Sequence, residues 1–234
     1  MIGARVTHIG RICREPATAV AEAIWESGFE DSGDSGVVDA DAYLAGFGER
    51  LGCPLTQDEW AEALRAAVTP IDETLTLAAS VRRQARVAVL TNNNLLVKRA
   101  VDTVFPELRP IFGRDFFVSA EFHARKPEPE AYLRCLARVG AAADATLFVD
   151  DSVKNVAGAE RAGLRAHLYR SPEGLERVLS AEGLLWRNSD ARAEMGRSQF
   201  REVARRVRKS LGRRRRDRRP FPRASQASTN RQVQ

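Results

Sequence analysis

Short apolar runs alternate with segments of helical spacing from residue 86 onward, and this alternation is the strongest constraint on the fold. The first run, VAVL, contains no polar residue, as expected for a parallel strand buried on both faces. Short loops join the runs to the helical segments between them. The pattern therefore predicts an α/β fold with a doubly wound, Rossmann-like parallel sheet. The predicted strands are residues 87–90, 116–118, 146–149 and 165–169, and the predicted helices are 95–105, 129–139, 153–162 and one that begins at 171–172.

The first third of the chain carries helical patterns. Thr56 and Glu59 have the spacing of a capping box, in which each side chain bonds the other residue's backbone N–H at the start of a helix. A Gly/Ser/Asp stretch at 33–36 predicts a loop. Apolar residues also have helical spacing between residues 6 and 13, and we expect no strand before them. The remaining helices are predicted at 15–27, 39–51, 56–68 and 72–84.

The net charge of +6 is unevenly distributed along the chain. Residues 197–234 contain 14 Lys or Arg against 2 Asp or Glu, a net charge of +12, so the first 196 residues carry −6. Such a composition predicts a disordered tail, and a solvated extension is its simplest interpretation. Attachment to nucleic acid or an anionic surface is the alternative. The acidic body is typical of a cytoplasmic domain rather than a nucleic-acid-binding one.

The cysteines and the hydropathy pattern bear on the compartment. Cys13, Cys53 and Cys135 are far apart and form no CxxC motif, which argues against a disulfide framework and against a zinc site. No run approaches 18 apolar residues, and the first residues lack a secretory apolar region. We therefore expect a cytoplasmic protein with reduced cysteines and no transmembrane segment.

Polar residues gather where two predicted strands end. Thr91 and Asn92 follow the first strand, and Asp150 and Asp151 follow the third. Ligands of open α/β sheets bind beyond the carboxyl ends of the strands, so we expect these side chains to meet there. Two carboxylates suit Mg²⁺, which takes one or two carboxylates together with waters and phosphate. Lys126, which precedes a helix, would add the positive charge that a phosphoryl group needs.

Each of these segments also has a purely structural interpretation. The stretch 91–94 has the residues of a helix N-cap, and Lys126 with Pro127 is compatible with a solvated turn. Asp150 and Asp151 would also cap the next helix and interact with its dipole. The occurrence of all three segments, in order, on successive β–α units favours a site over three unrelated local features.

Three segments resemble motifs two, three and four of the haloacid dehalogenase-like (HAD) hydrolases: VAVLTNNN, ARKPEPEAYLRCL and TLFVDDSVKNVAGAERAG. The helices before them resemble the cap of the first subfamily. The resemblance implies that Thr91 and Asn92 bind phosphate, Lys126 stabilises phosphate and nucleophile, and Asp151, supported by Asp150, binds Mg²⁺. Asn155 stands where many relatives have an acid. The implied domains are a helical cap (1–71), an α/β core (72–186) and a basic tail (187–234).

The family's first motif, an apolar strand ending in DxD, supplies a nucleophilic aspartate and is not found before the cap helices. VVDADA at 37–42 fits superficially, but only two apolar residues precede Asp39, and Asp39 or Asp41 is a natural helix N-cap. We expect a chain that lacks its first strand, and therefore an unstable one. The leading hypothesis is a Mg²⁺-dependent phosphatase acting on a small phosphorylated metabolite. The alternative is a catalytically inactive protein that binds a phosphate ligand.

Overall fold

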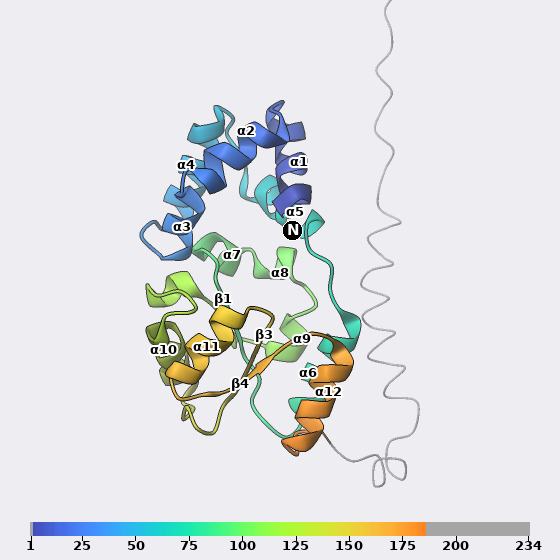
Figure 1. The fold of residues 1–234 in the computed structure, drawn as a ribbon. Coiled ribbons are helices and arrows are strands. Elements are labelled where there is room, and N and C mark those ends of the chain that lie inside the picture. The colour runs from blue at the N-terminus through green and yellow to red at the C-terminus, as the bar shows by residue number, and fades with distance from the viewer. Residues whose placement is uncertain (1, 186–234) are drawn as a thin grey trace, which may run out of the picture. The chain divides into compact units, whose positions relative to one another are not determined.

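The computed structural model describes residues 2–185 of the 234, and Figure 1 shows their arrangement. The predicted basic tail at 187–234 lies outside the described residues, so its contacts with nucleic acid or anionic surfaces stay a prediction. None of the helices within residues 2–185 combines the length and the apolar character needed to cross a bilayer.

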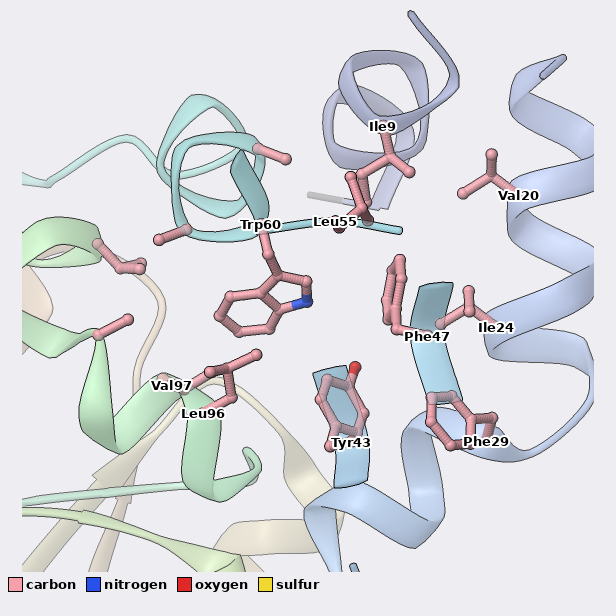
Figure 2. Close-up of a cluster of buried hydrophobic side chains, with 14 of the residues drawn as sticks. Ile9, Val20, Ile24, Phe29, Tyr43, Phe47, Leu55, Trp60, Leu96 and Val97 are labelled. Atoms are coloured by element: carbon pink, nitrogen blue, oxygen red, sulfur yellow. The ribbon is translucent and has the colours of Figure 1, made fainter. Parts of the chain in front are cut away.

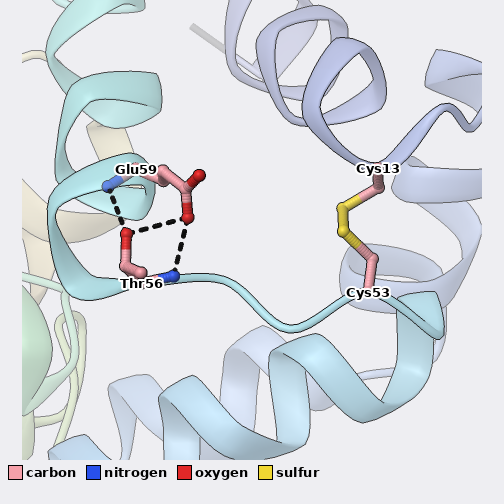
Figure 3. Close-up of a disulfide and its surroundings, with 4 residues drawn as sticks. All are labelled: Cys13, Cys53, Thr56 and Glu59. Carbon is pink, nitrogen blue, oxygen red and sulfur yellow. Dashed lines mark hydrogen bonds between the residues drawn. A yellow bond between two sulfur atoms is a disulfide. The ribbon is translucent and has the colours of Figure 1, made fainter.

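Side-chain caps fix where two helices of the first third begin. Asp39 caps α4, because its Oδ1 accepts hydrogen bonds from the N–H groups of Asp41 and Ala42 at 3.0 and 2.8 Å. Thr56 and Glu59 form the predicted capping box at the start of α5 (Figure 3). The helices are α1 (Ile2–Cys13), α2 (Ala17–Ala21), a π-helix (Glu22–Glu26), α3 (Phe29–Asp34), α4 (Ala40–Leu51) and α5 (Gln57–Ala66). The predicted loop at 33–36 begins later than expected, because α3 includes its first two residues.

Aromatic side chains form the centre of a buried cluster among these helices (Figure 2). The ring of Tyr43 stacks on that of Phe29 with centroids 5.1 Å apart, and meets the ring of Trp60 edge-on at 6.1 Å. Leu96, from α7 (Leu95–Arg99), belongs to the same cluster. The helical third of the chain and the α/β part therefore share one hydrophobic core.

A disulfide joins Cys13, the last residue of α1, to Cys53, which follows α4 (Figure 3). Their Cα atoms lie 5.4 Å apart. The sequence-based expectation of reduced cysteines is therefore wrong for this pair. A separation of 40 residues carries no pairing signal; the bridge depends on how the helices pack. Cys135 is free and buried.

The rest of the described chain alternates strands and helices, as predicted. The main departure is the single helix expected at 95–105, which the structure divides in two at Ala100, where φ and ψ are −94° and 10°. After α6 (Asp72–Val81) the elements are β1 (Val89–Thr91), α7, α8 (Val101–Val104), α9 (Arg109–Phe112), β2 (Phe116–Val118), a 3₁₀ helix (Ser119–Phe122), α10 (Pro129–Val139), β3 (Leu147–Asp150), α11 (Val153–Arg161), β4 (Arg165–Leu168) and α12 (Pro172–Ala181).

The strands form parallel pairs, which confirms the predicted α/β class. β1 pairs with β2, Val89 lying opposite Phe116, and β3 pairs with β4, Leu147 lying opposite Arg165. Within residues 2–185 no ladder joins the first pair to the second. The predicted single sheet is therefore present as two separate two-stranded sheets. The predicted boundary between cap and core at residue 71 stays a prediction.

Candidate active site

Asn92 and Lys126 connect two of the predicted site segments. The Asn92 side chain accepts a hydrogen bond from the backbone N–H of Lys126 at 2.9 Å and donates one to the backbone carbonyl of Lys126 at 2.8 Å. Asn92 follows β1, and Lys126 lies in the loop before α10. This two-point contact fixes the backbone of Lys126 beside the carboxyl end of β1, as expected from the sequence.

The ammonium group of Lys126 joins both strand pairs. Its Nζ donates to the carbonyl of Leu90, in β1, at 2.8 Å and to Oδ2 of Asp150, at the end of β3, at 2.7 Å. The side chains of Lys126 and Asp150 are each only 9% exposed. A buried charge needs a partner of opposite charge and further hydrogen bonds, and this pair has both.

Asp150 is held by three donors. Its Oδ1 accepts from the N–H of Ser152 and from Nδ2 of Asn155, each at 2.9 Å, in addition to the contact of Oδ2 with Lys126. Burial raises the pKa of Asp150, but the bonds from Lys126, Ser152 and Asn155 outweigh burial and keep the pKa below its usual value. Asp150 is therefore a fixed carboxylate at neutral pH.

Asp151 has the opposite environment. It is exposed at the end of β3, and within residues 2–185 no hydrogen bond or ion pair engages its carboxylate. In the same part of the chain no group of three or more His, Cys, Asp or Glu side chains converges. A Mg²⁺ ion needs only one or two protein carboxylates, so the exposed Asp151, beside the anchored Asp150, is compatible with such an ion.

The three asparagines after β1 have separate roles. Asn93 donates a hydrogen bond from Nδ2 to Oγ1 of Thr91 at 2.7 Å, while Asn94 caps α7 by accepting from the N–H of Val97 at 3.1 Å. The structural interpretation of the segment as an N-cap is thus correct for Asn94. Asn92 and Asn93 instead arrange Lys126 and Thr91, and the contact of Asn93 was not predicted.

Ser119 is a site residue that the sequence analysis missed. It is fully buried after β2, its Oγ accepts from the N–H of Asn93 at 3.0 Å, and it donates to the carbonyl of Asp34 at 2.6 Å. Arg125, next to Lys126, forms an ion pair with Asp31. The α3 region is therefore bonded to the α/β part at two points, Ser119 after β2 and Arg125 before α10. No motif in the sequence indicates these long-range contacts.

The carboxyl group of Asp34 is unusual in this region. Burial, followed by the nearby carboxylate of Glu30, raises the pKa of Asp34 to about 7, although the positive charges of Arg125 and Arg5 oppose the shift. Its Oδ1 is buried and has no hydrogen-bond partner within the described residues. Asp34 therefore changes its charge near neutral pH at the boundary between the helical third and the site.

The comparison with protein families agrees with this geometry. The family model "haloacid dehalogenase-like hydrolase" matches residues 19–163, more than half of the chain. The chain belongs to the haloacid dehalogenase-like hydrolase family. The resemblance drawn from the three sequence segments is thereby confirmed.

Individual relatives of this family member include a phosphatase. Phosphatase MT3486 of Mycobacterium tuberculosis (strain CDC 1551 / Oshkosh) is 35% identical over 109 residues, which are 44% of this chain and 49% of that protein. The match thus spans about half the length of that relative. Among solved structures, the magnesium complex of the HAD family enzyme BT-2542 from Bacteroides thetaiotaomicron aligns with a TM-score of 0.59 and 21% identity, over 75% of this chain and 89% of that one. A predicted HAD-like family hydrolase from Porphyromonas gingivalis aligns with a TM-score of 0.61, the same identity and the same coverage. Both structures support the fold.

The acidic pair at 39 and 41 does not join the site of this HAD-like hydrolase. Asp39 caps α4, and Asp41 forms an ion pair with Arg99 at 2.7 Å. Within residues 2–185 neither carboxylate contacts Lys126. The interpretation of Asp39 as a helix cap rather than as a nucleophile is confirmed.

Proposed function

We propose that this chain binds phosphate and Mg²⁺ at a Mg²⁺-dependent phosphomonoesterase site. The observation that carries the proposal is the Lys126–Asp150 pair, which is buried, fixed by Asn92, and placed beside the free carboxylate of Asp151. The similarity to Phosphatase MT3486 supports it. So does the structural match to BT-2542 in complex with magnesium and inorganic phosphate, at a TM-score of 0.60 and 21% identity.

Each of these residues has a separate role in binding a phosphoryl group. The hydroxyl of Thr91, fixed by Asn93, donates a hydrogen bond to a phosphoryl oxygen. The ammonium of Lys126 neutralises negative charge in a site sheltered from water, where a fixed charge stabilises a transition state most strongly. Asp151 would hold Mg²⁺, with Asp150 supporting it, and the bound ion would neutralise further phosphoryl charge.

Within residues 2–185 no side chain is placed to act as the attacking group. Among the described residues the carboxylate paired with Lys126 is that of Asp150, which three donors already engage. An aspartate that attacks phosphorus needs a free oxygen near that ammonium. This observation favours a second candidate function, phosphate binding without turnover.

Hydrolysis of p-nitrophenyl phosphate with and without Mg²⁺ separates these two functions, and isothermal calorimetry with inorganic phosphate measures binding alone. We expect Asp151→Asn to abolish any Mg²⁺-dependent hydrolysis. Asp144→Asn, which changes an exposed aspartate in the loop before β3, is the matched control and keeps it. Phosphate binding without hydrolysis identifies the chain as a binding protein, and the absence of both refutes the proposed site.

A further inference from the structure

A pocket opens at the amino ends of β1 and β2. It is lined by residues 82–87, between the end of α6 and β1, and by residues 111, 112 and 115, at the end of α9 and just before β2. The helices α6 and α9 contact each other (Figure 1). Lys126 is held at the other end of β1 by Asn92, which follows the strand. The pocket is therefore separate from the candidate active site.

The pocket combines positive charge with apolar surface. The charged side chains of its lining are those of Arg82, Arg83, Arg86 and Asp115. Its apolar side chains include those of Ile111 and Phe112. Its volume of about 370 Å³ falls within the range of about 300–1,000 Å³ that is usual for small-molecule sites. These properties suit a small anion that also carries an apolar group.

The aspartate of the lining is bonded to Arg86. The guanidinium of Arg86 donates from Nε and Nη2 to the two carboxylate oxygens of Asp115, each at 2.7 Å. The hydrogen bonds from Arg86, with the positive charge of Arg82 adding to them, hold the pKa of Asp115 below its usual value. Asp115 is therefore a carboxylate at neutral pH, and its charge is balanced by that of Arg86.

Arg82 is held in place, but part of its guanidinium remains available. Its Nη1 donates to the carbonyl of Pro110 at 3.0 Å and to the carbonyl of Ile111. Within the described part of the chain, Nε and Nη2 of Arg82 form no hydrogen bond or ion pair. The Nε–H and Nη2–H groups of a guanidinium point the same way and bind two oxygens of one phosphate or carboxylate. Arg82 therefore offers an anchored pair of donors at the pocket.

We propose that this pocket binds a small organic phosphate, with two phosphate oxygens on Nε and Nη2 of Arg82 and the apolar part of the ligand against Ile111 and Phe112. A phosphate monoester carries nearly two negative charges at neutral pH, so it gains more than a carboxylate from a lining rich in arginine. The lining contains no hydroxyl, thiol or imidazole side chain, so the pocket holds its ligand without changing it chemically. This site does not rest on the proposed function.

Calorimetric titration with phenylphosphonate, which a phosphatase does not hydrolyse, tests the pocket in EDTA without Mg²⁺. We expect saturable binding that Arg82→Gln weakens at least about tenfold, because both donors are lost. Arg82→Lys keeps the charge without the paired donors, and its affinity should lie between the two. Arg11→Gln, at an exposed arginine of α1, is the matched control and keeps the affinity. Equal binding by wild type and Arg82→Gln overturns the proposal, and equal binding of benzoate overturns the assignment to a phosphate.

Protection of arginines from phenylglyoxal locates the ligand on the wild-type chain, so this measurement does not depend on how the variants fold. Peptide mapping by mass spectrometry should show that phenylphosphonate slows the modification of Arg82 and not that of Arg11. Unchanged modification of Arg82 at saturating phenylphosphonate overturns the proposal. Binding that requires Mg²⁺ and is unaffected by Arg82→Gln also overturns it, since the anion would then be at Lys126 and the proposed function would stand. Binding in EDTA that Arg82→Gln removes, without Mg²⁺-dependent phosphate binding, supports the pocket and refutes the proposed function.

Discussion

Removing the positive charge of Lys126 should destabilise the protein far more than removing any exposed lysine. The Lys126 and Asp150 side chains are each 9% exposed, with Nζ and Oδ2 2.7 Å apart. Breaking a buried pair from one side typically costs about 3–5 kcal/mol, because a buried charge loses its partner. Asp150 keeps its bonds from Ser152 and Asn155, so we expect Lys126→Met to lower the free energy of unfolding by about 3 kcal/mol.

Urea unfolding monitored by circular dichroism measures this loss of free energy. The control is Lys154→Met, at an exposed lysine of α11, whose free energy of unfolding is expected to stay within about 0.5 kcal/mol of the wild-type value. Adding Asp150→Asn to Lys126→Met removes the orphaned charge and should restore part of the loss, a coupling of about 1–3 kcal/mol.

The stabilisation by the Lys126–Asp150 pair depends on pH in a defined direction. The pKa of Asp150 is lowered in the folded state, so its stabilisation is present above the unfolded pKa of about 3.9 and disappears as the pH falls through the folded value. The difference between wild type and Lys126→Met should therefore shrink below about pH 4. Equal losses for Lys126→Met and Lys154→Met at pH 7 would refute the reasoning.

Three further predictions follow from other parts of the molecule. The folded pKa of Asp34 is raised to about 7, so its ionisation opposes folding as the pH rises from about 4 through 7. Asp34→Asn should therefore raise the unfolding free energy at pH 8 by an amount on the order of 2 kcal/mol and leave it nearly unchanged at pH 4. Reduction of the Cys13–Cys53 disulfide, which spans 40 residues, should lower the free energy of unfolding by about 4 kcal/mol, because the unfolded chain gains conformational entropy. Dithiothreitol should therefore lower the urea midpoint, and an unchanged midpoint contradicts the bridge. Ser119→Ala should cost about 1–3 kcal/mol, because it removes the hydrogen-bond partner of two partly buried backbone groups, the carbonyl of Asp34 and the N–H of Asn93. A loss below about 0.5 kcal/mol in the same assay argues against the attachment.

The sequence predicted those elements whose ends carry their own signals. The helix at 129–139 begins at a proline and ends before Gly140, which adopts the left-handed φ of 69° that glycine favours, and the structure reproduces both ends. β2 also appears at its predicted residues, because a short apolar run between polar residues has few alternatives. The capped starts at Asp39 and Thr56 follow the same logic.

The features that the sequence did not predict depend on contacts between distant residues. The disulfide and the bonds of Ser119 require knowing how α1, α3 and the loop after β1 are placed, which local patterns do not encode. At the site the residue types were predictable, but the different environments of Asp150 and Asp151 were not. Two adjacent aspartates after a strand have the same local sequence pattern. Only the hydrogen-bond donors that engage Asp150 in the structure distinguish it from Asp151.

Calorimetric titration of inorganic phosphate, with and without Mg²⁺, tests the central claim most directly, because it detects the phosphate site whether or not the chain hydrolyses a substrate. The account predicts Mg²⁺-dependent binding that Asp151→Asn abolishes and Asp144→Asn retains. Absence of phosphate binding by the wild-type chain in Mg²⁺, or binding that is the same in Asp151→Asn, would contradict it.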